Sequence, residues 1–391
     1  MRVLLTCDAA YSHFMPMVAP MAQELQAAGH QVAVATGSSL AGELHQLGLP
    51  HLTLPRKLSA AQKMADPKLV RRRGLTPEEL AKPVTGASFG RMFAGEDALH
   101  AAEDILSVTS KFRPDVVVRE NAELGGYLFA EKIGVPCVTL DTAATAAVRD
   151  PGMLPWLNDS RAAFGLRPVP DISTLTKDPW ISWLPQDWYS EQSHSPAHRH
   201  YRAADQPTET LDPAIAALPA DRPLVLATLG SNTRVFAHGL PLSEIVEALA
   251  ALPVTAVVAL GEHLAPSEWT GPRPDNVHLV SFVQQRLLLS ACDLFITHGG
   301  FASVRETLTA GVPTVAVPLG QDQPWNAQRL AELGIGVTLT PNEADAATLA
   351  TACHRVLQNS SYRHAARGFQ RQTLGLPGIA ELVADLGKLI S

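Results

Sequence analysis

The feature that most constrains the fold is an alternation of short apolar runs, rich in β-branched residues, with longer segments of helical period. Such alternation is typical of repeated β-α units around a parallel sheet, whose strands are buried on both faces. The series occurs twice, once in each half of the chain. Because 391 residues also exceed the size at which a single core usually stops growing, we expect two doubly wound α/β domains.

The predicted strands follow from the apolar runs, and helical segments that end at glycines such as Gly29 and Gly48 separate them. Two stretches, Arg56–Ala94 and Asp150–Asp205, lack the pattern and are predicted to be functional loops or lids. The expected strands are Arg2–Thr6, Gln31–Ala35, Pro114–Val118 and Val135–Thr139 in the first half and Leu224–Thr228, Ala256–Leu260, Val277–Val280, Leu294–Thr297 and Thr314–Pro318 in the second.

The two series and the segment between them predict the domain boundaries. Residues 1–205 are expected to form an acceptor-side first domain, 206–222 a linker containing Pro and Asp, and 223–375 the second domain. In the last segment, 376–391, apolar residues recur on one helical stripe. We expect it to be a helix that packs back toward the first domain.

Composition and charge exclude several classes of function. A net charge of -7 gives no protein-wide attraction for nucleic acid or anionic lipid. The basic run Arg71–Arg73 is predicted to be a solvated helix face. The four cysteines lack metal-ligand spacing, so no metal site is expected. No apolar stretch is long enough for a membrane span, and the N-terminus is typical of a first strand rather than a signal peptide. These features predict a soluble cytoplasmic protein, a monomer or a homodimer.

A glycine-rich turn follows the predicted strand Leu294–Thr297 and opens a helix. Its residues are His298, Gly299 and Gly300, with Ser303 and Glu306 further along. A helix N-terminus after such a turn binds anions through free N–H groups and the helix dipole. The alternative is a capping box, in which Ser303 caps the helix and Glu306 reaches back.

Several motifs in register make the sequence resemble the family-1 glycosyltransferases of the GT-B fold, especially bacterial enzymes that decorate antibiotics. They are Leu294–Gly300, Gly311–Pro313 and Pro318–Ala327, with Asp322 placed 24 positions after His298. The resemblance implies two Rossmann-like domains that face each other across a cleft. It also implies an enzyme that uses a nucleoside-diphosphate sugar as co-substrate, with no other cofactor and no metal.

The resemblance assigns donor-binding roles to residues of the second half. His298 and Ser303, with the backbone at Gly299 and Gly300, are expected to bind the diphosphate, and Ser231 to lie near it. Glu306 is expected at the ribose hydroxyls, and Asp322 with Gln323 at the sugar hydroxyls. Phe282 or its neighbour Val283 is expected against the base, with Gln285 toward the ribose. For Phe282, ordinary core packing is the alternative.

The resemblance also places the catalytic residues in the first half. His13 lies in the loop after the first strand, where the family keeps its catalytic histidine, although Ser12 replaces the usual glycine. Glu120, 14 residues before Gly134, stands where the family has a partner aspartate. A carboxylate partner raises the basicity of an imidazole and fixes its tautomer. The alternatives are a surface histidine at position 13 and, for Glu120, a solvent-facing loop glutamate or one paired with Arg119.

These assignments predict an inverting transferase in which His13, oriented by Glu120, deprotonates an acceptor hydroxyl. Seven Met at or before Met153 and four Trp between Trp156 and Trp188 favour a hydrophobic aglycone. The donor base is left open between thymidine and uridine, with a preference for thymidine. Two alternatives remain, a sugar-nucleotide epimerase and a catalytically silent partner that binds nucleotide sugars.

Overall fold

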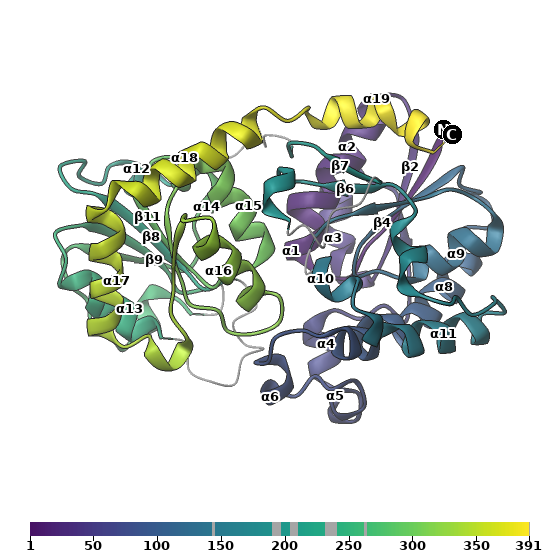
Figure 1. Cartoon of the computed structure of the whole chain (residues 1–391), viewed down its shortest axis with the longest axis horizontal. Helices are drawn as coiled ribbons and strands as arrows, with labels where there is room; N and C mark the ends of the chain where they lie inside the picture. The colour runs from purple at the N-terminus through teal and green to yellow at the C-terminus, as the bar shows by residue number, and fades with distance from the viewer. Residues whose placement is uncertain (143–144, 190–196, 204–209, 231–240, 262–263, 391) are drawn as a thin grey trace. The chain divides into compact units, whose positions relative to one another are not determined.

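The computed structural model describes residues 1–142, 145–189, 197–203, 210–230, 241–261 and 264–390 (Figure 1). Two compact units make up the chain. The first contains Met1–Glu79, Val84–Ala204 and Leu376–Ser391, and the second contains Leu80–Pro83 and Asp205–Gly375. The four residues Leu80–Pro83 fall inside the range 1–205 expected for the first domain but belong to the second unit. The expected linker 206–222 lies wholly within the second unit.

The first unit is built on a fully parallel sheet with the strand order β3-β2-β1-β4-β5-β6-β7. Its strands are β1 (Arg2–Thr6), β2 (Gln31–Thr36), β3 (His51–Thr53), β4 (Val116–Glu120), β5 (Cys137–Leu140), β6 (Trp180–Ser182) and β7 (His198–His200). The order reverses between β1 and β4. In open parallel sheets, ligands bind beyond the carboxyl ends of the strands at such a reversal.

Helices cover both faces of this sheet. The helices are α1 (Tyr11–His13), α2 (Ala19–Ala27), α3 (Ala41–Gln46), α4 (Ala60–Met64), α5 (Pro67–Arg73), α6 (Pro77–Leu80), α7 (Gly86–Phe89), α8 (Glu96–Val108), α9 (Gly125–Ile133), α10 (Thr145–Val148), α11 (Leu154–Ala163) and α19 (Ile379–Leu389). Val and Leu predominate in the central strands β1 and β4, which are buried on both faces. One core cluster joins Leu4 and Val117 of the sheet to Ile105 of α8 and Phe129 of α9.

Three strands of this sheet were not predicted. The stretch Asp150–Asp205, predicted as loops, contributes β6 and β7, in which Trp180 and Ile181 are fully buried. Both strands are three residues long and rich in aromatic residues and His, so they give no alternating or β-branched signal. The third, β3, is equally short.

The stretch Arg56–Ala94 was also predicted as loops, and it contains the short helices α4 to α7. Ser59, Asp66 and Thr85 cap the first turns of α4, α5 and α7 by accepting backbone N–H bonds. Helices this short show no amphipathic period, so the sequence pattern could not reveal them. Their ends are nevertheless fixed by local hydrogen bonds.

The second unit repeats the design with the parallel order β10-β9-β8-β11-β12-β13. All five strands predicted in the second half are present. The elements are β8 (Leu224–Thr228), β9 (Thr255–Ala259), β10 (Val277–Val280), β11 (Leu294–Thr297), β12 (Thr314–Ala316), β13 (Gly336–Thr338), α12 (Pro213–Ala216), α13 (Leu242–Ala250), α14 (Gln285–Leu289), α15 (Phe301–Ala310), α16 (Gln323–Glu332), α17 (Ala346–Gln358) and α18 (Ser360–Leu374). Here the order reverses between β8 and β11.

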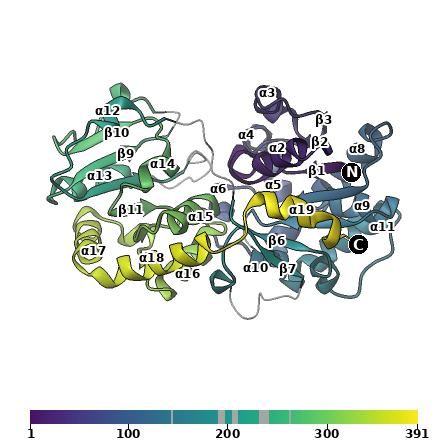
Figure 2. The same cartoon turned by 90° about the horizontal axis from the view of Figure 1, so that it is seen from above.

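The C-terminal helix α19 belongs to the first unit and packs against α2 (Figures 1 and 2). Its buried residues are Ile379, Leu382, Val383 and Leu386, which recur at helical spacing. A backbone hydrogen bond from Arg202 to the carbonyl of Pro377 holds the segment before it. Within the described ranges, no helix has the length and apolar content needed to cross a bilayer.

Candidate active site

His13 and Glu120 meet at the strand-order reversal of the first sheet. β1 leads through Asp8 into α1, whose last residue is His13, while Glu120 is itself the last residue of β4. The two strands are parallel neighbours, with Thr6 opposite Arg119. Their carboxyl ends therefore lie at one edge, where the two side chains converge.

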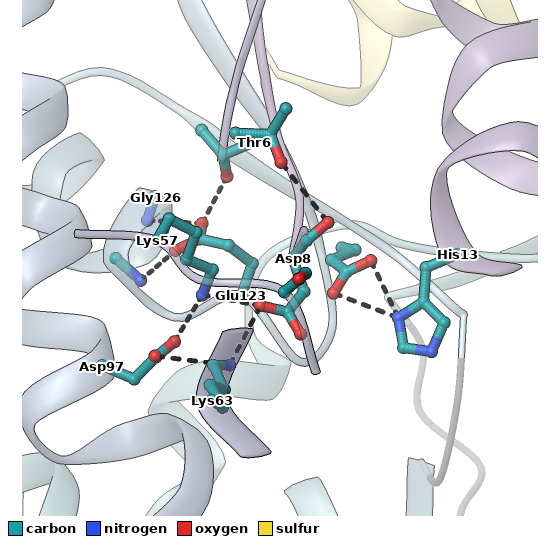
Figure 3. A network of polar contacts seen from close by, with 12 residues as sticks. Thr6, Asp8, His13, Lys57, Lys63, Asp97, Glu123 and Gly126 are labelled. Atoms are coloured by element: carbon teal, nitrogen blue, oxygen red, sulfur yellow. Dashed lines mark hydrogen bonds and ion pairs between the residues drawn. The ribbon is translucent and has the colours of Figure 1, made fainter. Parts of the chain in front are cut away.

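The two side chains form a polar contact. Nδ1 of His13 lies 3.2 Å from Oε2 and 3.3 Å from Oε1 of Glu120 (Figure 3). The Glu120 side chain is fully buried, whereas 23% of the His13 side chain is exposed. Because carboxylate oxygens accept hydrogen bonds, Nδ1 is the ring nitrogen that carries the hydrogen and donates a hydrogen bond to Glu120. This tautomer leaves Nε2 of His13 as the nitrogen that can accept a proton.

The turn that carries His13 is fixed by the helical segment that follows it. The helix widens after His13 into a single π-turn, Phe14–Val18, in which the N–H of Ala19 bonds to the carbonyl of Phe14. Pro16 and Pro20 lack N–H donors, and π-turns recur at functional sites. Phe14 is fully buried. His13 thus lies at the edge of a firmly packed turn.

The glycine-rich turn lies at the strand-order reversal of the second sheet, between β11 and α15. Gly299 has a left-handed φ of 81°, which favours glycine, and its N–H donates to Thr297. Helix α15 starts at Phe301, and its N-cap Gly300 provides no side-chain cap. The first N–H groups of a helix lack partners within it, so this end is able to bind an anion.

The imidazole of His298 lies close to Gly300 of this turn and to Gly230 in the segment after β8. A Cβ on Gly300 would come within 2.5 Å of Nε2, and one on Gly230 within 2.7 Å of the ring. Nδ1 of His298 is buried without a hydrogen-bond partner in the described structure. Burial lowers the pKa of His298 to about 4. The ring is therefore neutral near pH 7, and it can donate one N–H to a ligand.

Three of the expected donor-binding residues are brought together beside this turn. Nε2 of Gln285 donates to Oε2 of Glu306 at 2.7 Å and to Oγ of Ser303 at 3.3 Å. Ser303 is the third residue of α15, two positions after its first residue. The capping-box alternative is therefore wrong, because Gly300 is the N-cap.

The nucleobase segment divides into one exposed and one buried side chain. Phe282 is 61% exposed, so the core alternative for this residue is wrong. An exposed aromatic face before a polar cluster is suited to stacking on a base. Val283 instead belongs to a core cluster with Leu288 and Phe295, which leaves only its backbone for a ligand. Ser231 lies outside the described residues.

Asp322 and Gln323 begin α16, and they differ in their contacts. The Asp322 carboxylate accepts a hydrogen bond from Asn326 at 2.9 Å, and the same Asn326 amide donates to the carbonyl of Gly299. The side-chain oxygen of Gln323 accepts from the backbone N–H of Leu319. Asn326 thus links the glycine-rich turn to Asp322. Sequence reasoning assigned it no role, although its position four residues after Asp322 places both on one helix face.

The loop before Asp322 is fixed by the four-residue segment Leu80–Pro83. Gln321 has a left-handed φ of 57°, and its backbone N–H and side-chain amide donate to the carbonyls of Lys82 and Leu80. A Cβ on Gly320 would come within 2.1 Å of the Leu80 carbonyl oxygen. No local sequence pattern indicates this contact, because the partners are some 240 residues apart.

Comparisons with known proteins bear on the fold and on the class of enzyme. The family described as "Erythromycin biosynthesis protein CIII-like, C-terminal domain" matches residues 215–389. The chain is 27% identical to the tylactone mycaminosyltransferase of Streptomyces fradiae, over 100% of this chain and 92% of the relative. It is 29% identical to the L-demethylnoviosyl transferase of Streptomyces niveus, over 94% and 92%. The structure of the glycosyltransferase VinC in complex with dTDP superposes with a TM-score of 0.76 at 23% identity, over 100% and 99% of the two chains. This chain is a GT-B glycosyltransferase.

The neutral His298 of the glycosyltransferase gives a testable pH dependence of donor binding. A diphosphate bound beside this ring would favour the imidazolium, and its binding would then raise the pKa of His298 from its value of about 4. A group whose pKa is raised in the complex takes up a proton on binding, and affinity then increases as pH falls. From pH 8 to pH 5.5 we expect Kd for TDP-glucose to fall about threefold or more. TDP-glucose is chosen because its diphosphate diester does not titrate in this range.

Isothermal titration at several pH values measures this dependence, with His298→Gln as the matched variant. Glutamine keeps an N–H donor but does not titrate between pH 5 and 8. Its Kd for TDP-glucose is expected to be nearly independent of pH. An equal pH dependence in the wild type and in His298→Gln would contradict the assignment of this ring to the diphosphate.

Proposed function

We propose that this glycosyltransferase moves a sugar from a nucleoside-diphosphate sugar to a hydroxyl of a hydrophobic natural-product aglycone, with inversion at the anomeric carbon. The observation that carries the proposal is the contact between His13 and the buried carboxylate of Glu120 at the strand-order reversal. An imidazole held in this way has the tautomer and the basicity that a general base needs.

In the proposed reaction, Nε2 of His13 takes the proton of the acceptor hydroxyl. The hydroxyl oxygen attacks the anomeric carbon from the face opposite the leaving group. The new carbon–oxygen bond forms as the bond to the diphosphate breaks, and the nucleoside diphosphate leaves with the electron pair. Glu120 stabilises the imidazolium that results, because its ionised carboxylate faces Nδ1. One displacement without a covalent enzyme intermediate gives inversion.

Groups that follow the strands of the second sheet are proposed to stabilise the negative charge on the leaving diphosphate. The N-terminus of α15 offers N–H groups and the positive end of its dipole, and His298 adds a neutral N–H donor. These donors support a reaction that proceeds without a divalent cation. Phe282 is proposed to stack on the base, and Glu306 to bind the ribose in place of its present contact with Gln285.

For the transferred sugar, the contacts favour Asp322 over Gln323. The carboxylate of Asp322 accepts a hydrogen bond from Asn326 and is half-buried at the start of α16. Carboxylates accept hydrogen bonds from sugar hydroxyls readily. The oxygen of Gln323 is already used by the backbone of Leu319, so only its amide nitrogen is proposed to face the sugar. We favour a thymidine diphosphate sugar as donor, in keeping with the dTDP bound to VinC.

Mass spectrometry of a mixed acceptor panel tests the proposed function. The purified protein is incubated with aromatic and polyketide alcohols and with either TDP-glucose or UDP-glucose, in parallel with and without EDTA. We expect a sugar-sized mass gain on at least one acceptor and release of nucleoside diphosphate that depends on that acceptor. A gain that disappears with EDTA would overturn metal independence. Donor that binds but is never consumed across the panel would overturn the transferase itself.

A further inference from the structure

A buried network of charges lies beside His13 and is not used by the proposed reaction (Figure 3). Asp8, which follows β1, has its Oδ1 3.2 Å from Nζ of Lys57 and 3.6 Å from Nζ of Lys63. Both lysines come from the stretch Arg56–Ala94, and both are almost completely buried. The hydroxyl of Thr36 donates a hydrogen bond to the backbone carbonyl of Asp8. This stretch is thereby joined to the segment that leads from β1 to His13.

Asp97 of α8 is the other anion of the network, and it accepts hydrogen bonds from Lys57 and Arg73. Nζ of Lys57 lies 2.5 Å from its Oδ2, and Arg73 donates to its Oδ1. Asp8 is held differently, because its buried Oδ1 has ion pairs but no hydrogen bond. Burial alone would raise the pKa of Asp8, but Lys63 and Lys57 together lower it below the ordinary value. Asp8 is therefore a carboxylate kept ionised by lysines that bind Asp97 more directly.

The described titratable groups around His13 come from five places in the first unit. Glu120 at the end of β4 faces Nδ1, and Asp8 and the buried thiol of Cys7 lie on the segment after β1. The electrostatic interaction between Asp8 and His13 favours the ionised form of Asp8. Lys57 and Lys63 lie on the far side of Asp8, with Asp97 beyond them (Figure 3). Glu123, before α9, is engaged by Thr6 and by two backbone N–H groups.

We propose that Asp8 is a positioning residue for the base His13, and that its ionised carboxylate, set between the buried lysines and the imidazole, adds a second negative charge that stabilises the imidazolium. The lysines set the strength of this effect, because each positive charge near Asp8 makes the electrostatic potential at the His13 ring less negative. The stretch that carries them thus contributes to the basicity of His13 without contacting it. This inference rests on the proposed function, in which His13 is the base.

The test compares two variants that change the charge beside His13 in opposite directions. Asp8→Asn removes a negative charge at nearly constant shape, and Lys63→Met removes a positive charge while keeping an unbranched apolar side chain. NMR titration of the His13 ring in the substrate-free protein, assigned with His13→Gln, reads its pKa directly. We expect a decrease of about half a unit or more in Asp8→Asn and an increase in Lys63→Met. The acidic limb of the kcat/KM profile should move in the same directions, and Asp8→Glu should restore the wild-type profile.

A purely structural role for Asp8 predicts that activity falls in both variants without the opposite pKa shifts. The pKa of His13 would then stay constant, or it would move in the same direction in both variants. Either result would overturn the inference. If Asp8→Asn does not fold, the sign of the shift in Lys63→Met alone decides. The NMR readout needs no substrate, so loss of the Asp8 effect is distinguishable from failure of the proposed function, which is read from the activity of His13→Ala.

Discussion

Replacing His13 with alanine is expected to reduce kcat by about 10²- to 10⁴-fold, the usual contribution of a general base. The physical reason is that the described structure offers no other imidazole in contact with Glu120. Donor affinity should change by less than about twofold, because the proposed donor residues lie on the other sheet. Steady-state release of nucleoside diphosphate measures kcat, and isothermal titration with TDP measures donor affinity.

Two further variants separate the base from its partner. Glu120→Gln keeps the shape of the buried side chain but removes its charge, so we expect a smaller loss of kcat than in His13→Ala. His45→Ala is the matched control, because it makes the same chemical change at an exposed histidine of α3. Its kcat should equal that of the wild type. An unchanged kcat in His13→Ala, or an equal loss in His45→Ala, would rule out His13 as the base.

The largest expected effect on stability is that of Asp97→Asn. This carboxylate is almost completely buried and contacts Lys57, Lys63 and Arg73. Removing its charge leaves Lys57 and Lys63 with Asp8 as a buried anion and takes the carboxylate from Arg73, and breaking a buried pair costs about 3–5 kcal/mol in other proteins. We expect the unfolding transition of the first unit to shift to lower temperature, as measured by differential scanning calorimetry. In the control variant Glu332→Gln, an exposed ion pair with Arg329 is lost, and the transition should barely move.

The stability difference between the wild type and Asp97→Asn also depends on pH. Burial opposes ionisation of Asp97, but Lys57, Lys63 and Arg73 more than compensate and lower its pKa far below the ordinary range. A carboxylate with a lowered pKa stabilises the fold above its unfolded pKa, which is about 4 for aspartate. That stabilisation is lost as pH falls toward the native pKa. The difference in the free energy of unfolding between the two proteins should therefore be largest near pH 7 and decrease below about pH 4. A difference that is constant over this range would contradict the ionised state of Asp97.

The sequence predicted those parts of the fold that depend on period and spacing. Buried runs such as Leu294–Thr297 are long enough to reveal strands, and the positions of His13 and Glu120 relative to their strands placed both at one edge. The spacing from His298 to Asp322 likewise placed these two residues at one edge of the second sheet. Where the signal was short, as in β6 and β7, the tertiary contacts of Trp180 and Ile181 decide the structure, and no local pattern records them.

The buried charges were missed for a different reason. Lys57, Lys63, Arg73 and Asp97 are spread over some 40 residues without period, and charged residues are rarely buried unless they are paired. Arg73 was therefore predicted to lie on a solvated face with its neighbours, and this prediction was wrong, because it bonds to Asp97 in the core. Only the fold brings its partner within reach. The helix start at Gly300 was similarly undecidable locally, since Ser303 also fits a capping position.

The most direct test of the central claim is the mass of an acceptor after incubation with TDP-sugar and EDTA, measured in parallel for the wild type and His13→Ala. The proposed mechanism predicts a sugar-sized mass gain with the wild type that is reduced at least about a hundredfold in rate with the variant. An equal rate of gain with both proteins would show sugar transfer that does not use His13, and it would contradict the mechanism proposed for this glycosyltransferase.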